Sequence, residues 1–155
     1  MNRACFSLLL SGVVTVCGCR SVPVTGRMQF VAVTEKQEVA LAETTYRDML
    51  TEQPLSTNQA TIRVVNRVGQ RIAAVAERPD FDWEFRVIAS PDQNAFCLPG
   101  GKVAVYEGLL PLCQNEAELA VVLAHEVAHA LARHGGERMS HENVANFFGR
   151  AVNYF

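Results

Sequence analysis

The sequence predicts an α+β domain in which helices pack on a small antiparallel sheet. Three observations indicate this class. Apolar residues recur at helical spacing before residue 77 and again after residue 115, whereas residues 83–106 alternate between apolar and polar side chains as strands do. Apolar residues make up 49% of the chain and charged residues 19%, a balance that suits a folded core. The length of 155 residues leaves room for one such domain.

Residues 1–18 are predicted to form a lipoprotein-type signal peptide. A positive charge at Arg3 precedes an apolar run that is too short to span a membrane. A glycine directly before Cys19 resembles a bacterial lipoprotein cleavage site, so we expect Cys19 to carry lipid and to anchor the chain in a membrane. An ordinary signal peptide without lipid, or a short anchor that is retained, is the alternative. Residues 19–33 are then an extended tether that leads into a domain over residues 34–155.

Two amphipathic helices are predicted at the start of the domain, over about residues 35–51 and 58–76. Thr34, with Gln37 three residues later, predicts a capping box at the start of the first helix. Apolar residues repeat every three or four positions in both helices, as expected for helices with one buried face. These residues are Val39, Ala42, Tyr46, Met49 and Leu50 in the first helix, and Ile62, Val65, Val68 and Ile72 in the second.

Three short strands are predicted next, over residues 83–89, 94–98 and 102–106. Pro99-Gly100-Gly101 predicts a tight reversal between the last two strands. Because short turns separate all three, we expect neighbouring strands to pair in an antiparallel sheet.

A third helix is predicted to begin after Asn115, with Glu118 closing a second capping box. Its central residues are apolar on every face, so we expect this helix to be buried. Gly135-Gly136 predicts its end, and a last amphipathic helix is expected from about residue 137 or 140 to residue 153.

The third helix carries the motif H-E-x-x-H at His125, Glu126 and His129. Residues four apart lie on one face of a helix, so the two imidazoles can bind one Zn²⁺ ion and Glu126 can reach a water molecule on that ion. Burying these three groups without partners is costly, and a metal would satisfy them together. A chance match on a solvated helix is the alternative. The motif therefore predicts a zinc site with a catalytic glutamate.

The charge and the cysteines limit the remaining possibilities. The formal net charge of -2 gives no indication of a nucleic-acid partner. Cys97 and Cys113 remain after removal of the signal, in a compartment that permits disulfides. A disulfide between them and two unpaired buried thiols are both compatible with the sequence.

Three blocks of the sequence, taken in order, resemble metallopeptidase family forty-eight, which includes the HtpX, CAAX prenyl and Oma-type peptidases, and within it the periplasmic LoiP-like lipoprotein branch. The blocks are residues 22–33, 94–110 and 115–140. The resemblance implies a zincin-like fold, with His125 and His129 as ligands of one zinc ion. Glu126 is implied as the general base that takes a proton from water and passes it to the leaving amine.

The resemblance also implies a substrate and a cellular location. An exposed edge strand containing Asn94, Ala95 and Phe96 would pair with an unfolded or extended polypeptide. The alternative is that Asn94 is a turn residue and Phe96 a core aromatic. The expected location is the bacterial cell envelope, as a lipoprotein that faces the periplasm. The outer membrane is preferred because Arg20, and not an aspartate, follows the lipidated cysteine.

One part of the family pattern is missing from this sequence. The family places its third zinc ligand on a later helix, in a Glu-x-x-x-Asp pattern, whereas only Glu137 and Glu142 supply carboxylates after the motif. His134 lies one residue short of the third histidine of metzincins, and we expect it to be a structural residue of the turn. His141 is expected to be a solvated helix residue, and Arg133 and Arg138 surface or ion-pairing groups.

The motif and the resemblance together lead to two candidate functions. The first is a zinc metalloendopeptidase that hydrolyses misfolded cell-envelope proteins, of which residues 34–155 form the N-terminal part of the catalytic domain. The alternative is a catalytically incomplete envelope lipoprotein that binds peptides as a chaperone or assembly factor.

Overall fold

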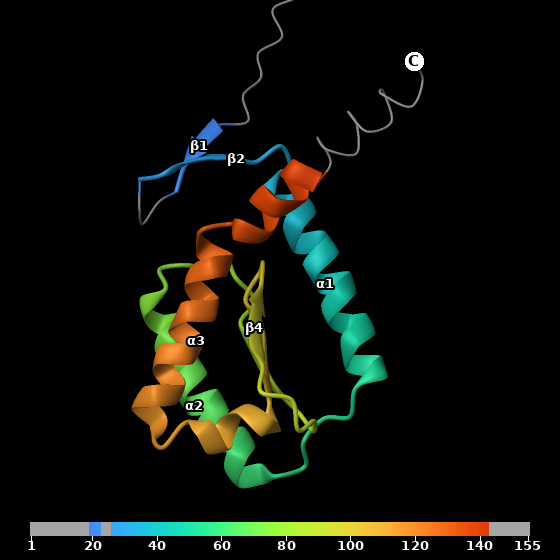
Figure 1. Cartoon of the computed structure of the whole chain (residues 1–155), viewed down its shortest axis with the longest axis vertical. Helices are drawn as coiled ribbons and strands as arrows, with labels where there is room; N and C mark the ends of the chain where they lie inside the picture. Colours follow the sequence, from blue (N-terminus) through green and yellow to red (C-terminus); the bar gives the residue numbers. More distant parts are fainter. Residues whose placement is uncertain (1–18, 23–25, 143–155) are drawn as a thin grey trace, which may run out of the picture.

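The computed structural model describes residues 19–22 and 26–142, which form three layers. Helix α1 (Glu35–Glu52) covers one face of a central three-stranded sheet, and helices α2 (Gln59–Val75) and α3 (Glu116–Leu131) cover the other (Figure 1). The predicted signal peptide and most of the predicted last helix lie outside the described residues. The α+β class is confirmed.

Each of the three helices begins directly after a capping residue, two of which, Thr34 and Asn115, were predicted from the sequence. The Thr34 hydroxyl accepts a hydrogen bond from the Gln37 amide, and the Gln37 side chain accepts one from the Thr34 amide at 2.9 Å, so the capping box of α1 is confirmed. Asn58 and Asn115 cap α2 and α3, each accepting two hydrogen bonds from backbone amides in the first turn. Local side-chain chemistry therefore sets these three boundaries.

The sheet is mixed, so the prediction of an antiparallel sheet was wrong in its topology. Strand β5 (Lys102–Tyr106) lies in the centre, parallel to β3 (Glu84–Ile88) and antiparallel to β4 (Ala95–Leu98). All five residues of β5 are buried, as expected for a strand covered by helices on both faces. The hairpin between β4 and β5 turns through Gly100 and Gly101, whose φ angles of 89° and 88° favour glycine. This order leaves β4 at one edge of the sheet.

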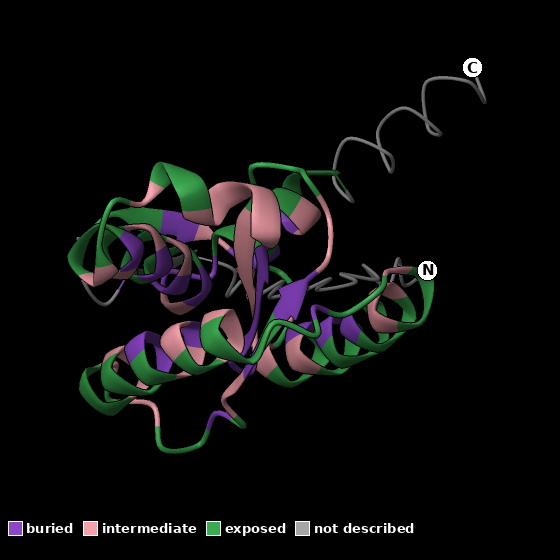
Figure 2. Cartoon of the chain, turned by 90° about the horizontal axis from the view of Figure 1, so that it is seen from below, coloured by how far each residue is buried: buried purple, intermediate pink, exposed green. Residues whose placement is uncertain are grey.

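The side chains of β5 divide the core in two. Val103 and Val105 pack against α2 and α3, whereas Ala104 and Tyr106 pack towards α1. Figure 2 shows the buried residues along the sheet and on the helix faces that meet it. The alternation is that of a strand with both faces buried.

Helix α3 is buried on one face only, which corrects the prediction that it is buried all round. Leu119, Leu123, Val127 and Ala130 face the core, while Val121 on the opposite side is 70% exposed. Alanine and valine make the exposed face apolar as well, at Ala117, Val121, Ala124 and Ala128, so the pattern alone did not distinguish the inner face. A short 3₁₀ helix, η1 (Glu107–Leu112), connects β5 to α3.

The end of α3 also differs from the prediction. The helix stops at Leu131, and Arg133 adopts a left-handed conformation with φ of 56°. Residues 134–142 are helical again, so the pair Gly135-Gly136 lies within this second segment and does not end α3. The change of direction carries residues 134–142 over the end of the sheet towards α1 (Figure 1).

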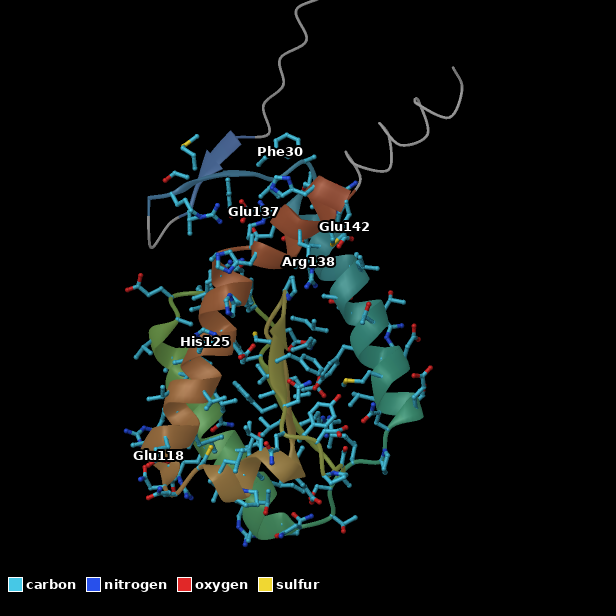
Figure 3. All side chains as sticks on the ribbon, viewed as in Figure 1. Phe30, Glu118, His125, Glu137, Arg138 and Glu142 are labelled. Atoms are coloured by element: carbon cyan, nitrogen blue, oxygen red, sulfur yellow. The ribbon has the colours of Figure 1, made fainter. Side chains whose placement is uncertain are left out.

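The predicted tether contains a small hairpin. Strand β1 (Cys19–Ser21) pairs antiparallel with β2 (Met28–Phe30), and the chain then continues to α1. The hairpin lies near residues 134–142, and the rings of Phe30 and His141 are 6.2 Å apart (Figures 1 and 3). Within the described part of the chain, no helix combines the length and apolar character needed to cross a membrane.

Candidate metal centre

The two histidines of the motif point a ring nitrogen at the same place. His125 and His129 lie one turn apart on α3, and their Nε2 atoms are 2.9 Å apart. Both side chains are exposed, and Glu126 between them is half-buried. Figure 3 shows His125 midway along α3. The i, i+4 spacing has therefore produced the convergence that the motif predicts.

This arrangement fits a zinc ion in part. Zinc–nitrogen bonds are about 2.0–2.1 Å long, so one ion can contact two Nε2 atoms at this separation. A catalytic zinc needs three protein ligands. Over residues 19–22 and 26–142, however, no cluster of three or more His, Cys, Asp or Glu side chains is placed to hold a metal ion. The described residues thus bring together two candidate ligands, His125 and His129.

Two carboxylates follow the motif, that of Glu137, which is paired with Arg27, and that of Glu142, which is exposed. Glu137 Oε1 accepts a hydrogen bond from Arg27 Nη1 at 2.8 Å, and the guanidinium holds the pKa of Glu137 below its usual range. Glu142 is exposed on the helical segment beyond it (Figure 3). Neither forms a metal-binding group with the motif histidines.

His134 lies against the motif, a position that the sequence analysis did not assign to it. Its Nδ1 atom is 2.6 Å from Nδ1 of His129, and the two ring centroids are 4.9 Å apart. A spacing of five residues does not place two side chains together on a continuous helix, so helical periodicity could not reveal the contact. The available signal was a third imidazole within nine residues of His125.

Arg133 forms a buried ion pair with Glu38, which confirms an ion-pairing role for this arginine. Nε and Nη2 donate to the two oxygens of Glu38, each at 2.9 Å, and Nη2 also donates to the Val33 carbonyl at 2.8 Å. Gly136 faces the same carboxylate so closely that a Cβ there would lie 1.5 Å from Glu38 Oε1. The start of α1 is thereby joined to the residues beside the motif.

A cleft of about 530 Å³ runs between β4 and the C-terminal end of α3. The strand side of the cleft includes Phe96, Cys97 and Leu98, and the helix side includes Glu126, His129, His134 and Arg138.

The two cysteines of the described domain are free, which resolves the open question of a disulfide between Cys97 and Cys113. Burial, together with the negative charge of Glu126, raises the pKa of the Cys97 thiol to about 12, so this thiol is protonated at neutral pH.

The three residues predicted to bind substrate occupy different positions. Phe96 lines the cleft, Ala95 packs against the core, and Asn94 is exposed just before β4. The Asn94 carbonyl accepts a hydrogen bond from the Tyr106 amide at 3.0 Å, so its main chain faces β5. Main-chain groups alternate in direction along an antiparallel ladder, so those of Ala95 and Cys97 face the open edge.

Comparison with known proteins identifies the family. The profile of Peptidase family M48 matches residues 59–153. Mitochondrial metalloendopeptidase OMA1 of Schizosaccharomyces pombe is 43% identical over 122 residues, covering 77% of this chain and 36% of the relative. OMA1 of Saccharomyces cerevisiae is 34% identical, covering 82% of this chain and 41% of the relative.

A bacterial relative shows the same partial coverage. The beta-barrel assembly-enhancing protease of Yersinia pestis is 32% identical over 106 residues, covering 68% of this chain and 22% of the relative. The chain thus spans between about a fifth and two-fifths of the length of these three curated relatives. The matched range of the family profile includes the H-E-x-x-H helix and the strands that face it. The chain belongs to peptidase family M48.

Proposed function

We propose that this chain carries the substrate-binding strand and two of the zinc ligands of a zinc metalloendopeptidase. The observation that carries the proposal is the convergence of His125 and His129 Nε2 atoms, 2.9 Å apart, beside Glu126 and a cleft along an edge strand. Membership of the peptidase family supports the same reading.

The motif residues divide the chemical work between them. His125 and His129 would hold the zinc ion, which would supply Lewis-acid polarisation of the scissile carbonyl. Glu126 lies in the cleft, where its carboxylate takes a proton from the attacking water and delivers it to the leaving amine. The third zinc ligand comes from outside the described residues.

The open edge of β4 supports an extended polypeptide as the substrate. Outward-facing main-chain groups of Ala95 and Cys97 are available to pair with an extended peptide, and Phe96 and Leu98 line the same cleft. A folded protein hides its main chain, so the substrates are unfolded or extended polypeptides. Main-chain pairing gives affinity with modest sequence preference.

The proposed location is the bacterial cell envelope, with a lipid on Cys19 that holds the domain at the periplasmic face of the outer membrane. The names of the relatives include mitochondrial enzymes and a bacterial beta-barrel assembly-enhancing protease, and the proposal follows the bacterial relatives. Misfolded envelope proteins are then the natural substrates. Release of a Cys19→Ser variant from the membrane fraction is the expected result.

Cleavage of casein in the presence of zinc tests the proposed activity. We expect Glu126→Gln to abolish cleavage and to leave zinc binding largely intact, because glutamine cannot carry the proton. Glu118→Gln is the matched control, because Glu118 lies at the far end of α3 from Arg138 and the cleft (Figure 3). Undiminished proteolysis by Glu126→Gln would contradict the mechanism.

A peptide-binding role without catalysis is the second candidate. It is favoured by one observation, that the described residues hold no group of three metal ligands. The same assay separates the two functions. Retention of unfolded casein without cleavage, with zinc present, would assign the chain to the binding role.

A further inference from the structure

We propose that His134 is a positioning residue that fixes the ring of His129, so that its Nε2 lone pair is directed at the metal. The inference rests on the zinc site proposed above. It assigns a role to a side chain that lies outside the H-E-x-x-H motif and beyond the end of α3.

Both ring nitrogens of His129 are in contact with another histidine. Nε2 lies 2.9 Å from His125 Nε2, and Nδ1 lies 2.6 Å from His134 Nδ1. Rotation of the His129 ring about its Cβ–Cγ bond would break both contacts. The ring is therefore held at its two ends.

The contact with His134 also selects the tautomer of His129. With neutral rings, the proton between His129 and His134 lies on one Nδ1 atom or the other. A metal ligand needs an unprotonated Nε2, and neutral His129 has that form only when its proton is on Nδ1. His134 Nδ1 is then the acceptor, and it stabilises the metal-binding tautomer. Metal-bound histidines in proteins commonly donate their second N–H in this way.

The break in the helix at Arg133 makes the contact possible. On a continuous helix, five residues correspond to a rotation of about 140°, which would carry His134 away from His129. The left-handed conformation of Arg133, with φ of 56°, interrupts the helix at this point. The guanidinium of Arg133 is buried and held by Glu38 and by the Val33 carbonyl, so the turn is fixed from α1.

A second anchor holds the segment that carries His134. The Ser140 hydroxyl donates to the Gly136 carbonyl at 2.6 Å and accepts from the Ala32 amide at 2.8 Å. Val33 and Ala32, in the chain leading into α1, thus bond Arg133 and Ser140, which lie on either side of Gly136. His134 itself remains exposed, so its replacement removes the contact with His129 without opening the core.

Zinc affinity, measured by competition with a chromophoric chelator, tests the inference. We expect His134→Ala to weaken zinc binding by about 10- to 100-fold, the usual effect of removing a partner of a metal ligand. His134→Asn should recover most of the affinity, because its amide oxygen can accept the same hydrogen bond. His141→Ala, an exposed histidine on the same segment, is the matched control and should bind zinc as the unaltered chain does. The melting temperature of the metal-free chain should be the same in all three variants.

The possible results separate this inference from the proposed function. Tight zinc binding by His134→Ala, together with loss of binding in His125→Ala, would overturn the role of His134 and leave the metal site in place. Equal loss of affinity in His134→Ala and His134→Asn would also overturn it, because a hydrogen-bond acceptor would then not matter. No zinc binding by the unaltered chain would overturn both.

Discussion

Replacing Glu38 by glutamine is expected to destabilise the fold strongly, because the change leaves the charge of Arg133 buried without its counter-charge. The side chain of Glu38 is 2% exposed and that of Arg133 is 10% exposed. Each of the two nitrogens that Arg133 directs at Glu38 donates one hydrogen bond to a carboxylate oxygen. Its third nitrogen, Nη1, is buried and has no hydrogen-bond partner, so no hydrogen bond at Nη1 can compensate for one lost at Glu38.

The magnitude follows from what glutamine can and cannot replace. Its carbonyl oxygen can accept one of the two hydrogen bonds, but its amide group presents a donor to the other guanidinium nitrogen. The Val33 carbonyl then becomes the main remaining acceptor for Arg133. Removing one partner of a buried ion pair typically costs about 3–5 kcal/mol. We expect a loss of that size in the free energy of unfolding.

Urea denaturation followed by circular dichroism measures this loss, provided that the slope of the transition is unchanged. Glu35→Gln is the matched control, because Glu35 lies on the same helix and pairs with Arg78 at a more exposed position. Exposed pairs contribute about 0–1 kcal/mol, so this variant should change stability little. In an Arg133→Met background, Glu38→Gln should cost little or even stabilise the fold, since it then removes a buried carboxylate that has lost its counter-charge. Equal losses for Glu38→Gln and Glu35→Gln would refute the reasoning.

Three further predictions concern other parts of the molecule. Gly69→Ala should lower the melting temperature, because the new Cβ would lie 2.3 Å from the ring of buried Phe85. Overpacking costs about 1–3 kcal/mol, which exceeds the gain of about 1 kcal/mol in helix propensity. An unchanged melting temperature would contradict this packing. With the N-terminal cysteines removed, a thiol reagent at pH 8 should modify Cys113 well before Cys97, whose pKa is raised to about 12 by burial and the charge of Glu126; equal rates would argue against that burial. The pKa of Glu137 is lowered in the folded state, so its ion pair stabilises the fold above the carboxyl's unfolded pKa and loses this effect as the pH falls through the folded value. The difference in melting temperature between the unaltered chain and Glu137→Gln should therefore shrink between about pH 5 and pH 3, and a difference that grows over that range would be inconsistent with the pairing.

Much of the local structure was predictable because its causes lie within a few residues of the chain. Thr34, Asn58 and Asn115 mark the starts of three helices, since each side chain bonds the amides of the turn that follows it. The reversal at Gly100 and the i, i+4 spacing of His125 and His129 are local in the same sense. The motif histidines and the family resemblance were therefore available from the sequence.

The topology of the sheet was not predictable in this way. Strands β3 and β4 follow each other in the chain, yet β5 lies between them. Which strand takes the centre depends on packing against helices on both faces, and this is settled only when α1, α2 and α3 are in place. The same long-range packing decided which face of α3 is buried and left the strand with Phe96 and Cys97 at the open edge.

The sequence by itself determined the helices, the hairpin and the two histidines that share a helical face, because short-range hydrogen bonds and periodicity fix them. The tertiary structure alone decided the strand order and the surroundings of those histidines. His134 reaches His129 because Arg133 breaks the helix, and Arg133 is held in that conformation by Glu38, which is 95 residues away in the chain. A contact that depends on an ion pair between distant segments exists only after the chain has folded, so no local pattern could have predicted it.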